Sequence, residues 1–384
     1  MRFLRTISTR RLLAVFGTAI AVAAGGTAIA LAGGSGPTPP PKPLANAVHD
    51  GLAAPEVQGI TARVKFTNHL VDAAGIQGSN PLLSGASGRL WLSPGNGLRL
   101  ELQSDNGDAQ IVANKDHFFV YDGTANTAYE GKVPKEKAGA EKNGAKHGIP
   151  SVARIQRGLT QARKHQLDIS GPVPGNIAGQ PAYTVRVGPG RPGGLLGAVE
   201  LAWDAARGLP LRVAVYARGN NTPVLELVAT DVSYGPVAAS TFSISPPADA
   251  HVVNVSQPGG GKSDKAGKRH AAGKLPFQLS APATLAGRAR SGVKKHGGVA
   301  IVRYGKDLDS LLVVEKPAKP ATQQSAPRHG HGKLDLPTVD VNGASAKVID
   351  TPLGSVVTFE RGGISYTVLG SVPAAVTESA ARGL

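Results

Sequence analysis

The residues from Gln180 to Pro247 constrain the fold most, because apolar and polar side chains alternate along this part of the chain. Residues 199–203, for example, are Val-Glu-Leu-Ala-Trp. A period of two places successive side chains on opposite faces of a β-strand. Glycine and asparagine break the alternation at short intervals, as turns between neighbouring strands do. The pattern therefore predicts four or five consecutive antiparallel strands that form a large sheet with one apolar face.

Earlier parts of the chain predict that this sheet begins well before residue 180. Strand patterns occupy residues 60–71, 89–92, 98–103, 109–113, 117–121 and 127–131. Asn106-Gly107 is a strong hairpin signal between two of them. An amphipathic helix, Ser151–Lys164, then interrupts the strands, and Ser151 is its expected N-cap. We expect one curved sheet whose two halves flank this helix in the sequence.

The apolar face of the sheet and the stripe of the helix are the candidate binding elements. The helix is the expected lid, with the apolar residues Val152, Ile155 and Leu159 facing the sheet. One interpretation is an ordinary packed core under a permanently seated helix. The other is a cavity that apolar guests enter when the helix yields. The candidate cavity residues are Leu98, Leu100, Leu102, Val199, Leu201, Trp203, Val213 and Val215.

The N-terminal residues predict export from the cytoplasm. Four arginines precede residues 12–32, which carry no charge. A basic start, an apolar stretch and small residues at its end are typical of a signal peptide. The stretch is also long enough to span a bilayer, so residues 1–34 are either a cleaved signal or a retained anchor. Positive charge on the inside places the remainder of the chain outside the cytoplasm.

Composition shifts divide the rest of the chain. We expect a proline- and glycine-rich spacer over residues 35–43 and a mainly β domain over residues 44–250. A basic, glycine-rich linker follows over residues 251–274, and a small α+β domain over residues 275–384. The last domain shows several short strand patterns and a terminal helix near residues 372–382.

The charge balance favours an anionic partner. The net charge is +16 and the isoelectric point is about 10.1. The basic residues between Lys132 and Lys164 either form a solvated surface or contact anionic headgroups or an acidic partner. Nucleic acid is disfavoured, because the chain is expected to be exported and its basic segments are not interleaved with aromatic residues. The chain has no cysteine, which excludes disulfides and thiolate chemistry.

No catalytic constellation emerges from the sequence. Residues 259–263 (GGGKS) resemble the end of a phosphate loop but lack its first glycine and the preceding strand. His329 and His331 are two imidazoles without an evident carboxylate partner. Asp307 and Asp309 have the pattern of exposed turn residues. We therefore expect a protein that is not an enzyme and uses no metal or cofactor.

Three segments carry a resemblance to a known family: residues 117–123 (HFFVYDG), 204–212 (DAARGLPLR) and 231–237 (DVSYGPV). Together they resemble the LolA/LolB superfamily of outer membrane lipoprotein carriers, which includes the RseB/MucB sensors. The resemblance covers residues 44–250. It implies a half-open antiparallel barrel whose concave apolar face takes acyl chains under covering helices.

The chain departs from classical carriers in its N-terminal segment and its last domain. Residues 360–370 (ERGGISYTVLG) look like small domains appended to half-barrels in Gram-positive, actinobacterial proteins. The resemblance implies a non-enzymatic, extracytoplasmic protein that binds or carries lipids or lipoprotein acyl chains at a membrane surface. The alternative is an RseB/MucB-like envelope-stress regulator that binds a membrane-anchored anti-sigma factor.

Overall fold

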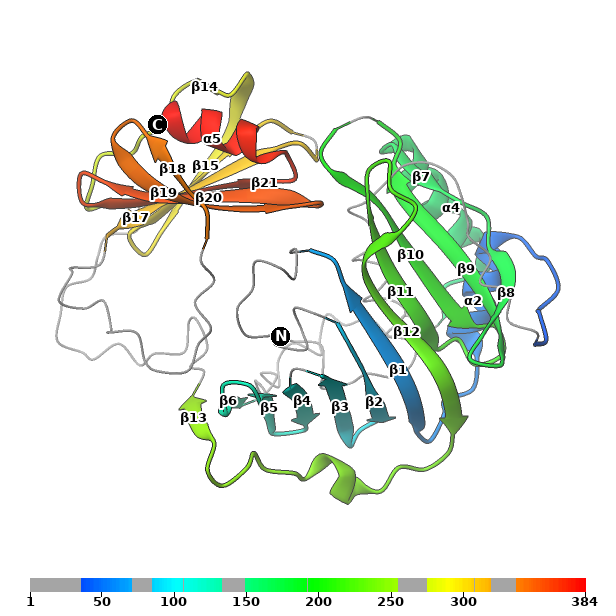
Figure 1. Ribbon diagram of the computed structural model, residues 1–384. Coiled ribbons are helices and arrows are strands. Elements are labelled where there is room, and N and C mark those ends of the chain that lie inside the picture. The colour runs from blue at the N-terminus through cyan, green and yellow to red at the C-terminus, as the bar shows by residue number, and fades with distance from the viewer. Residues whose placement is uncertain are drawn as a thin grey trace. The chain divides into compact units, whose positions relative to one another are not determined.

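The chain divides into two compact units (Figure 1). The structure, a computed structural model, describes residues 36–70, 85–105, 107–132, 149–191, 193–254, 275–306, 308–318 and 336–384. The first unit comprises residues 1–69, 78–191 and 197–260, and the second comprises residues 70–77, 192–196 and 261–384. The expected export segment lies outside the described residues, as does residue 255 onward of the expected linker. Within the described part, no helix has the length and apolar character needed to cross a membrane.

One curved sheet of thirteen strands organises the first unit (Figure 1). Its order is β13-β6-β5-β4-β3-β2-β1-β12-β11-β10-β9-β7, with β8 pairing β9. β1 pairs with β12 and so joins the two halves that the sequence predicts. The strands are β1 (Ile60–Asn68), β2 (Ala86–Ser93), β3 (Gly97–Ser104), β4 (Gly107–Asn114), β5 (His117–Asp122), β6 (Thr127–Lys132), β7 (Leu167–Ile169), β8 (Val173–Ile177), β9 (Gln180–Pro189), β10 (Leu196–Asp204), β11 (Pro210–Ala217), β12 (Pro223–Tyr234) and β13 (His251–Asn254).

The mainly β, antiparallel fold class is thus confirmed, with few helices. β13 is an addition, because its four residues open the segment expected to be linker and pair in parallel with β6. The hairpin expected around Asn106-Gly107 joins β3 to β4, with Ser104 opposite Gly107.

Two helices lie on one face of this sheet, which we call the helix face. They are α2 (Leu44–Ala53) and α4 (Val152–Lys164), and they pack against each other. The predicted N-cap is confirmed: the Ser151 side chain accepts a hydrogen bond from the backbone N–H of Arg154. A cap of this kind satisfies a donor that the first turn leaves free.

The opposite face, which we call the strap face, is crossed by the segment after β12. This strap, residues 237–247, contains the short helix η4 (Ala239–Phe242) and runs below β2–β5 in Figure 1. Phe242 is 1% exposed. Its carbonyl oxygen accepts a hydrogen bond from Asn114 Nδ2 at 3.2 Å, and Arg99 donates to the Thr241 carbonyl. The strap is therefore anchored to β3 and β4.

The most specific segment of the family resemblance, residues 204–212, forms the turn from β10 to β11. The Asp204 carboxylate accepts bonds from the N–H groups of Ala206 and Arg207, at 2.8 and 2.9 Å, and from the Tyr234 hydroxyl. Gly208 has φ +66°, and a Cβ there would lie 1.9 Å from the carbonyl oxygen of Gly51 in α2. These residues hold the turn together and bring α2 close to the sheet.

The second unit is an eight-stranded sheet with one helix, α5 (Ala374–Arg382), packed on β20 and β21. Its order is β14-β15-β16-β17-β21-β20-β19-β18. Val302, Val313, Val357 and Val368 of its core are all 0% exposed. The strands are β14 (Thr284–Leu285), β15 (Arg288–His296), β16 (Val299–Tyr304), β17 (Leu311–Pro317), β18 (Thr338–Val341), β19 (Ala344–Thr351), β20 (Gly354–Arg361) and β21 (Ile364–Gly370).

Candidate functional site: an apolar face that the helices half cover

The helix face carries an apolar row that crosses six neighbouring strands. Direct cross-strand pairing places one side chain from each of β1 to β6 in this row. Its members, which we call the central row, are Ala62, Leu90, Leu100, Ile111, Val120 and Tyr129. Side chains opposite one another on one face of a sheet are close enough to pack together. The row is therefore continuous across the first half of the sheet.

The helices seal the other half of the helix face. Tyr183, Leu201 and Trp203 are 1%, 5% and 3% exposed and form one core cluster with residues of α2. Leu159 and Ala162 of α4 pack against the same cluster. We call this region, over β9 and β10, the sealed half. Burial here is complete enough to supply a conventional core.

The central row lies in a different environment. Leu90, Leu100, Ile111 and Val120 are only partly buried. The core cluster that includes Ala62, Leu90 and Leu100 contains no residue of α2 or α4 in the described part of the chain. We call this region, over β1–β6, the open half. Contiguous apolar side chains that remain accessible are typical of binding surfaces.

The predicted cavity residues divide between the two halves. Leu98, Leu100 and Leu102 belong to the cluster of the open half. Leu201, Trp203 and Val213 belong to that of the sealed half. Val199 and Val215 are partly buried and lie in neither cluster. The eight residues share the helix face, and their role as cavity residues stays a prediction.

The predicted lid helix is seated mainly by one end. Leu159 packs on the sealed half, whereas Val152 and Ile155 are partly buried and lie outside its cluster. None of the residues of α4 is fully buried. The helix therefore covers the core without being enclosed by it.

Sequence reasoning missed a buried charge network on the strap face of β9–β12. Glu200 is 3% exposed, and its carboxylate accepts bonds from Arg186 at 2.9 Å, Arg212 at 2.6 Å and the Tyr216 hydroxyl at 2.8 Å. Arg212 also bonds Glu226 at 2.6 Å. The signal that could have revealed the network is the facing pair Glu200 and Arg186, which are cross-strand partners of opposite charge.

The network fixes the ionised form of Glu200. Burial by itself favours the neutral acid, but hydrogen bonds from Arg212, Tyr216 and Arg186 outweigh it and lower the pKa of Glu200 below its ordinary value. The same contacts raise the pKa of Arg212, despite its burial. All the charges are paired inside the sheet, so the network is structural rather than a site for a ligand.

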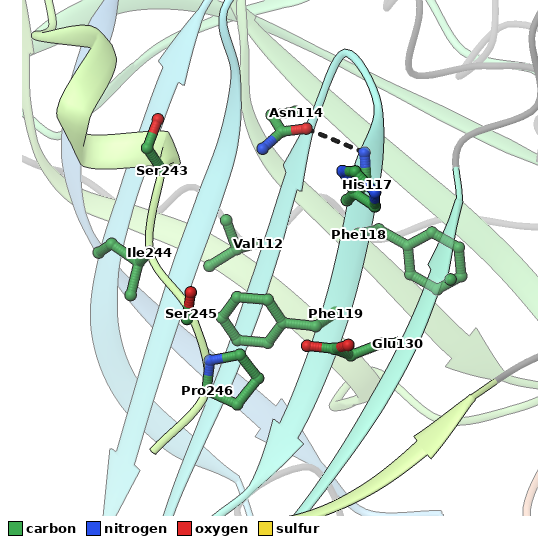
Figure 2. Close-up of a pocket in the computed structure, with 11 residues that line it drawn as sticks. Val112, Asn114, His117, Phe118, Phe119, Glu130, Ser243, Ile244, Ser245 and Pro246 are labelled. Atoms are coloured by element: carbon green, nitrogen blue, oxygen red, sulfur yellow. Dashed lines mark hydrogen bonds between the residues drawn. The ribbon is translucent and has the colours of Figure 1, made fainter. Parts of the chain in front are cut away.

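A hollow lies on the strap face, between the strap and β4–β6 (Figure 2). Its volume is about 280 Å³. Val112 and Phe119 form its apolar floor, Ile244 and Pro246 belong to the strap, and Glu130 lies beside the Phe119 ring. This hollow is on the opposite face from the central row, and no sequence pattern predicts it.

The remaining chemical candidates do not assemble into a site in the described residues. Asp309 pairs with Arg288 at 3.0 Å, which makes it part of a structural contact. Asp307, His329, His331 and residues 259–263 lie outside the described part of the chain. Among the described residues, no group of three or more metal-ligating side chains comes together.

No family model and no curated protein matches this chain. Solved structures give matches. The MucA/MucB complex of Pseudomonas aeruginosa aligns over 88% of this chain and 94% of its own, at 17% identity and a TM-score of 0.38. An uncharacterised Thermus thermophilus protein aligns over 55% and 97%, at 15% identity and 0.32. A putative outer membrane lipoprotein-sorting domain of Vibrio parahaemolyticus aligns over 50% and 91%, at 11% identity and 0.19.

These similarities concern the fold, and at such scores no residue, ligand or partner is transferred from them. The strand pairing itself carries the description of the fold.

Proposed function

We propose that the open half of the helix face binds an acyl chain of a lipid or lipoprotein outside the cytoplasm, without covalent chemistry. The central row carries this proposal. It joins six strands, it is apolar apart from the hydroxyl of Tyr129 at its end, and most of its members are only partly buried. An occupant that completes the burial must itself be apolar, because a polar group would find few partners there.

The energetics suit a reversible occupant. Each methylene that leaves water contributes about 0.8 kcal/mol, so a chain of ten methylenes gains at most roughly 8 kcal/mol before the entropy of binding is subtracted. Such a gain is enough for a stable complex and small enough for release. The seating of α4 by Leu159 and Ala162 leaves the rest of its apolar stripe outside the sealed core. A modest shift of α4 would expose part of the neighbouring sealed half and so enlarge the accessible apolar face without unfolding the unit.

The second candidate is the regulator, in which the open half binds a segment of a membrane-anchored protein. The dimensions of the central row are compatible with this second candidate function. Six strands at about 4.8 Å spacing span roughly 24 Å, which accommodates a peptide segment as well as an acyl chain. Co-purification of a membrane-anchored partner with delipidated protein that binds no fatty acid would select this candidate.

Binding of a fluorescent fatty acid to delipidated full-chain protein tests the proposal. Leu100→Asp and Ile111→Asp place charges in the central row, and we expect each to weaken binding at least tenfold. Gln103→Asp is the matched control, since Gln103 is an exposed residue of β3 on the strap face. Every variant keeps residues 1–34, so any fatty acid that binds to this apolar stretch contributes equally to all variants and does not affect their comparison. Equal affinity in all three variants would refute an acyl site on the open half.

A further inference from the structure

We propose that the side of the first unit formed by α4, α2 and the proline-rich spacer docks on an anionic membrane surface. The inference is separate from the acyl site, because it concerns the outward side of α4 and not the apolar face beneath it. Two independent features of the described residues carry it: an unpaired basic helix, and a spacer held against the sheet.

The first feature is the charge of α4. The helix contains Arg154, Arg157, Arg163 and Lys164 and no acidic residue. Arg154 and Arg157 are exposed, and the described residues offer their side chains no hydrogen-bond or ion-pair partner. The acidic residues nearby do little to offset this charge. Asp50 of α2 is paired with Lys42 at 2.7 Å, and Asp168 lies beyond the end of the helix.

The position of Arg154 is unfavourable for the helix by itself. It lies in the first turn, where the helix dipole favours acidic side chains, and no acidic residue is present there. A local rule broken without local compensation is expected at functional positions. A basic, amphipathic helix is also the usual form of a membrane-surface element. Ile149, just before the helix, is 36% exposed and adds an apolar side chain at the same end.

The second feature is the spacer. The sequence suggests a loose tether, but residues 37–43 are held on the sheet. The carbonyl oxygen of Pro37 accepts a bond from Asn176 at 3.0 Å, and that of Pro40 accepts one from the Tyr183 hydroxyl at 2.6 Å. Pro39 is buried. The spacer then enters α2, which packs against α4.

This attachment limits how far the unit can lie from a bilayer. The apolar stretch ends at residue 32, and Gly36 already touches the Asn176 side chain. Four Cα–Cα steps separate residues 32 and 36, and they span at most about 14 Å when fully extended. If the apolar stretch is retained in the membrane, the side of the unit that holds the spacer is the side that faces the headgroups. Charge then selects the lipid class: each basic residue near an anionic surface contributes about a fivefold preference.

Site-specific labelling tests the docking. The chain has no cysteine, so Gly158→Cys gives a unique label on α4, and an added Cβ there meets open space. Ser87→Cys, exposed on β2, is the matched label on the strap face. The full-chain protein is reconstituted into phosphatidylcholine vesicles with and without roughly one-third phosphatidylglycerol. We expect the dye at position 158 to be shielded from an aqueous quencher only in the anionic vesicles, and the dye at 87 to be quenched in both.

A pair of substitutions identifies the residues responsible. Arg154→Gln with Arg157→Gln should lower the docked-to-free ratio about 30-fold, and the circular dichroism should show the helix intact. Lys294→Gln with Lys295→Gln removes the same charge from exposed positions of β15 and should leave shielding unchanged. Equal shielding in neutral vesicles, or an equal effect of the control pair, would overturn the proposal. Absence of shielding in both vesicle types would also overturn the proposal.

Discussion

The two units differ in how completely the apolar face of the sheet is covered. Each has a sheet with one apolar face, and each places helix on that face. In the second unit, α5 and the strands bury Val302, Val313 and Val368 to 0% exposure. In the first unit, α2 and α4 bury Trp203 to 3% but leave the central row partly accessible. The incomplete cover is therefore a property of one region rather than of the chain as a whole.

Period-two alternation therefore identifies an apolar face but does not determine what covers that face. An uncovered apolar row is a liability for solubility unless something binds it. Substitutions in the two kinds of surface should therefore differ in their cost to stability.

A buried charge should distinguish the two units most sharply. Val313→Asp places a carboxylate in a fully sealed core and should destabilise the second unit by about 5 kcal/mol or more, so that it unfolds. Leu100→Asp, on the central row, should cost about 1–2 kcal/mol, because water reaches the site. In chemical denaturation, tryptophan fluorescence follows the first unit, which contains Trp91 and Trp203, and circular dichroism also follows the second unit, which has no tryptophan. Comparable losses would mean that the central row is as sealed as the second core.

Truncation should separate the two halves of the first unit. Trp203→Ala removes a buried ring packed with Tyr183 and should cost about 3–5 kcal/mol. Leu100→Ala should cost only about 1 kcal/mol. Urea midpoints of the two variants provide the test. A larger loss for Leu100→Ala would contradict the assignment of sealed and open halves.

Two buried glutamates should give the units opposite responses to acid. The pKa of Glu200 is lowered in the folded protein. Its contribution to the stability of the first unit is therefore present above pH 4.5 and is lost as the pH falls through the folded-state pKa. Burial raises the pKa of Glu315, although the N–H of Ser280 donates to its carboxylate at 3.0 Å. The contribution of Glu315 to the stability of the second unit is complete below pH 4.5 and is lost as the pH rises through the folded-state pKa.

Melting curves across pH 3–7, compared with those of single variants, test this contrast. Glu315→Gln should stabilise the second unit by about 1 kcal/mol at pH 7 and should flatten its pH dependence. Glu200→Gln should destabilise the first unit at pH 7 and remove its sensitivity to acid. Parallel pH profiles for both units in the unmodified protein would show that these glutamates do not govern the response.

The smallest expected effect is at the cap of α4. Ser151→Ala removes the side-chain bond to the Arg154 N–H and should loosen the helix by about 1 kcal/mol. Hydrogen exchange in α4 should increase, while exchange in α5 should not change. If α4 is the access element of the open half, fatty-acid association should also be faster in this variant.

Much of the fold could be predicted from local patterns. The alternation at residues 199–203, the Asn106-Gly107 hairpin and the cap at Ser151 each specify their own geometry. β15 was missed because its sequence, RARSGVKKH, has almost no apolar residues to alternate. β8 was missed because VPGNI is short and contains proline and glycine. Both strands form because they pair with neighbouring strands. Local strand propensity carries no information about such pairing.

The division of the candidate site could not be predicted in the same way. Leu100 and Trp203 have the same alternation, but only Trp203 is under a helix. That outcome depends on where α2 is placed by Gly51 and Gly208, which are far apart in the sequence. Glu200 is another case, since its burial depends on three partners contributed by two other strands, β9 and β11.

The pairing of β1 with β12 has a consequence for how the protein is made. Ile60 faces Tyr234, so the sheet joins residues from opposite ends of the first unit. Contacts at such sequence separation form slowly, because a long loop must close before they are made. Until β12 emerges, β1 presents a free strand edge with apolar neighbours, which favours aggregation. If the chain is exported as proposed, β1 can pair with β12 only after translocation has delivered residues 223–234, and folding of the first unit is then coupled in time to passage across the membrane.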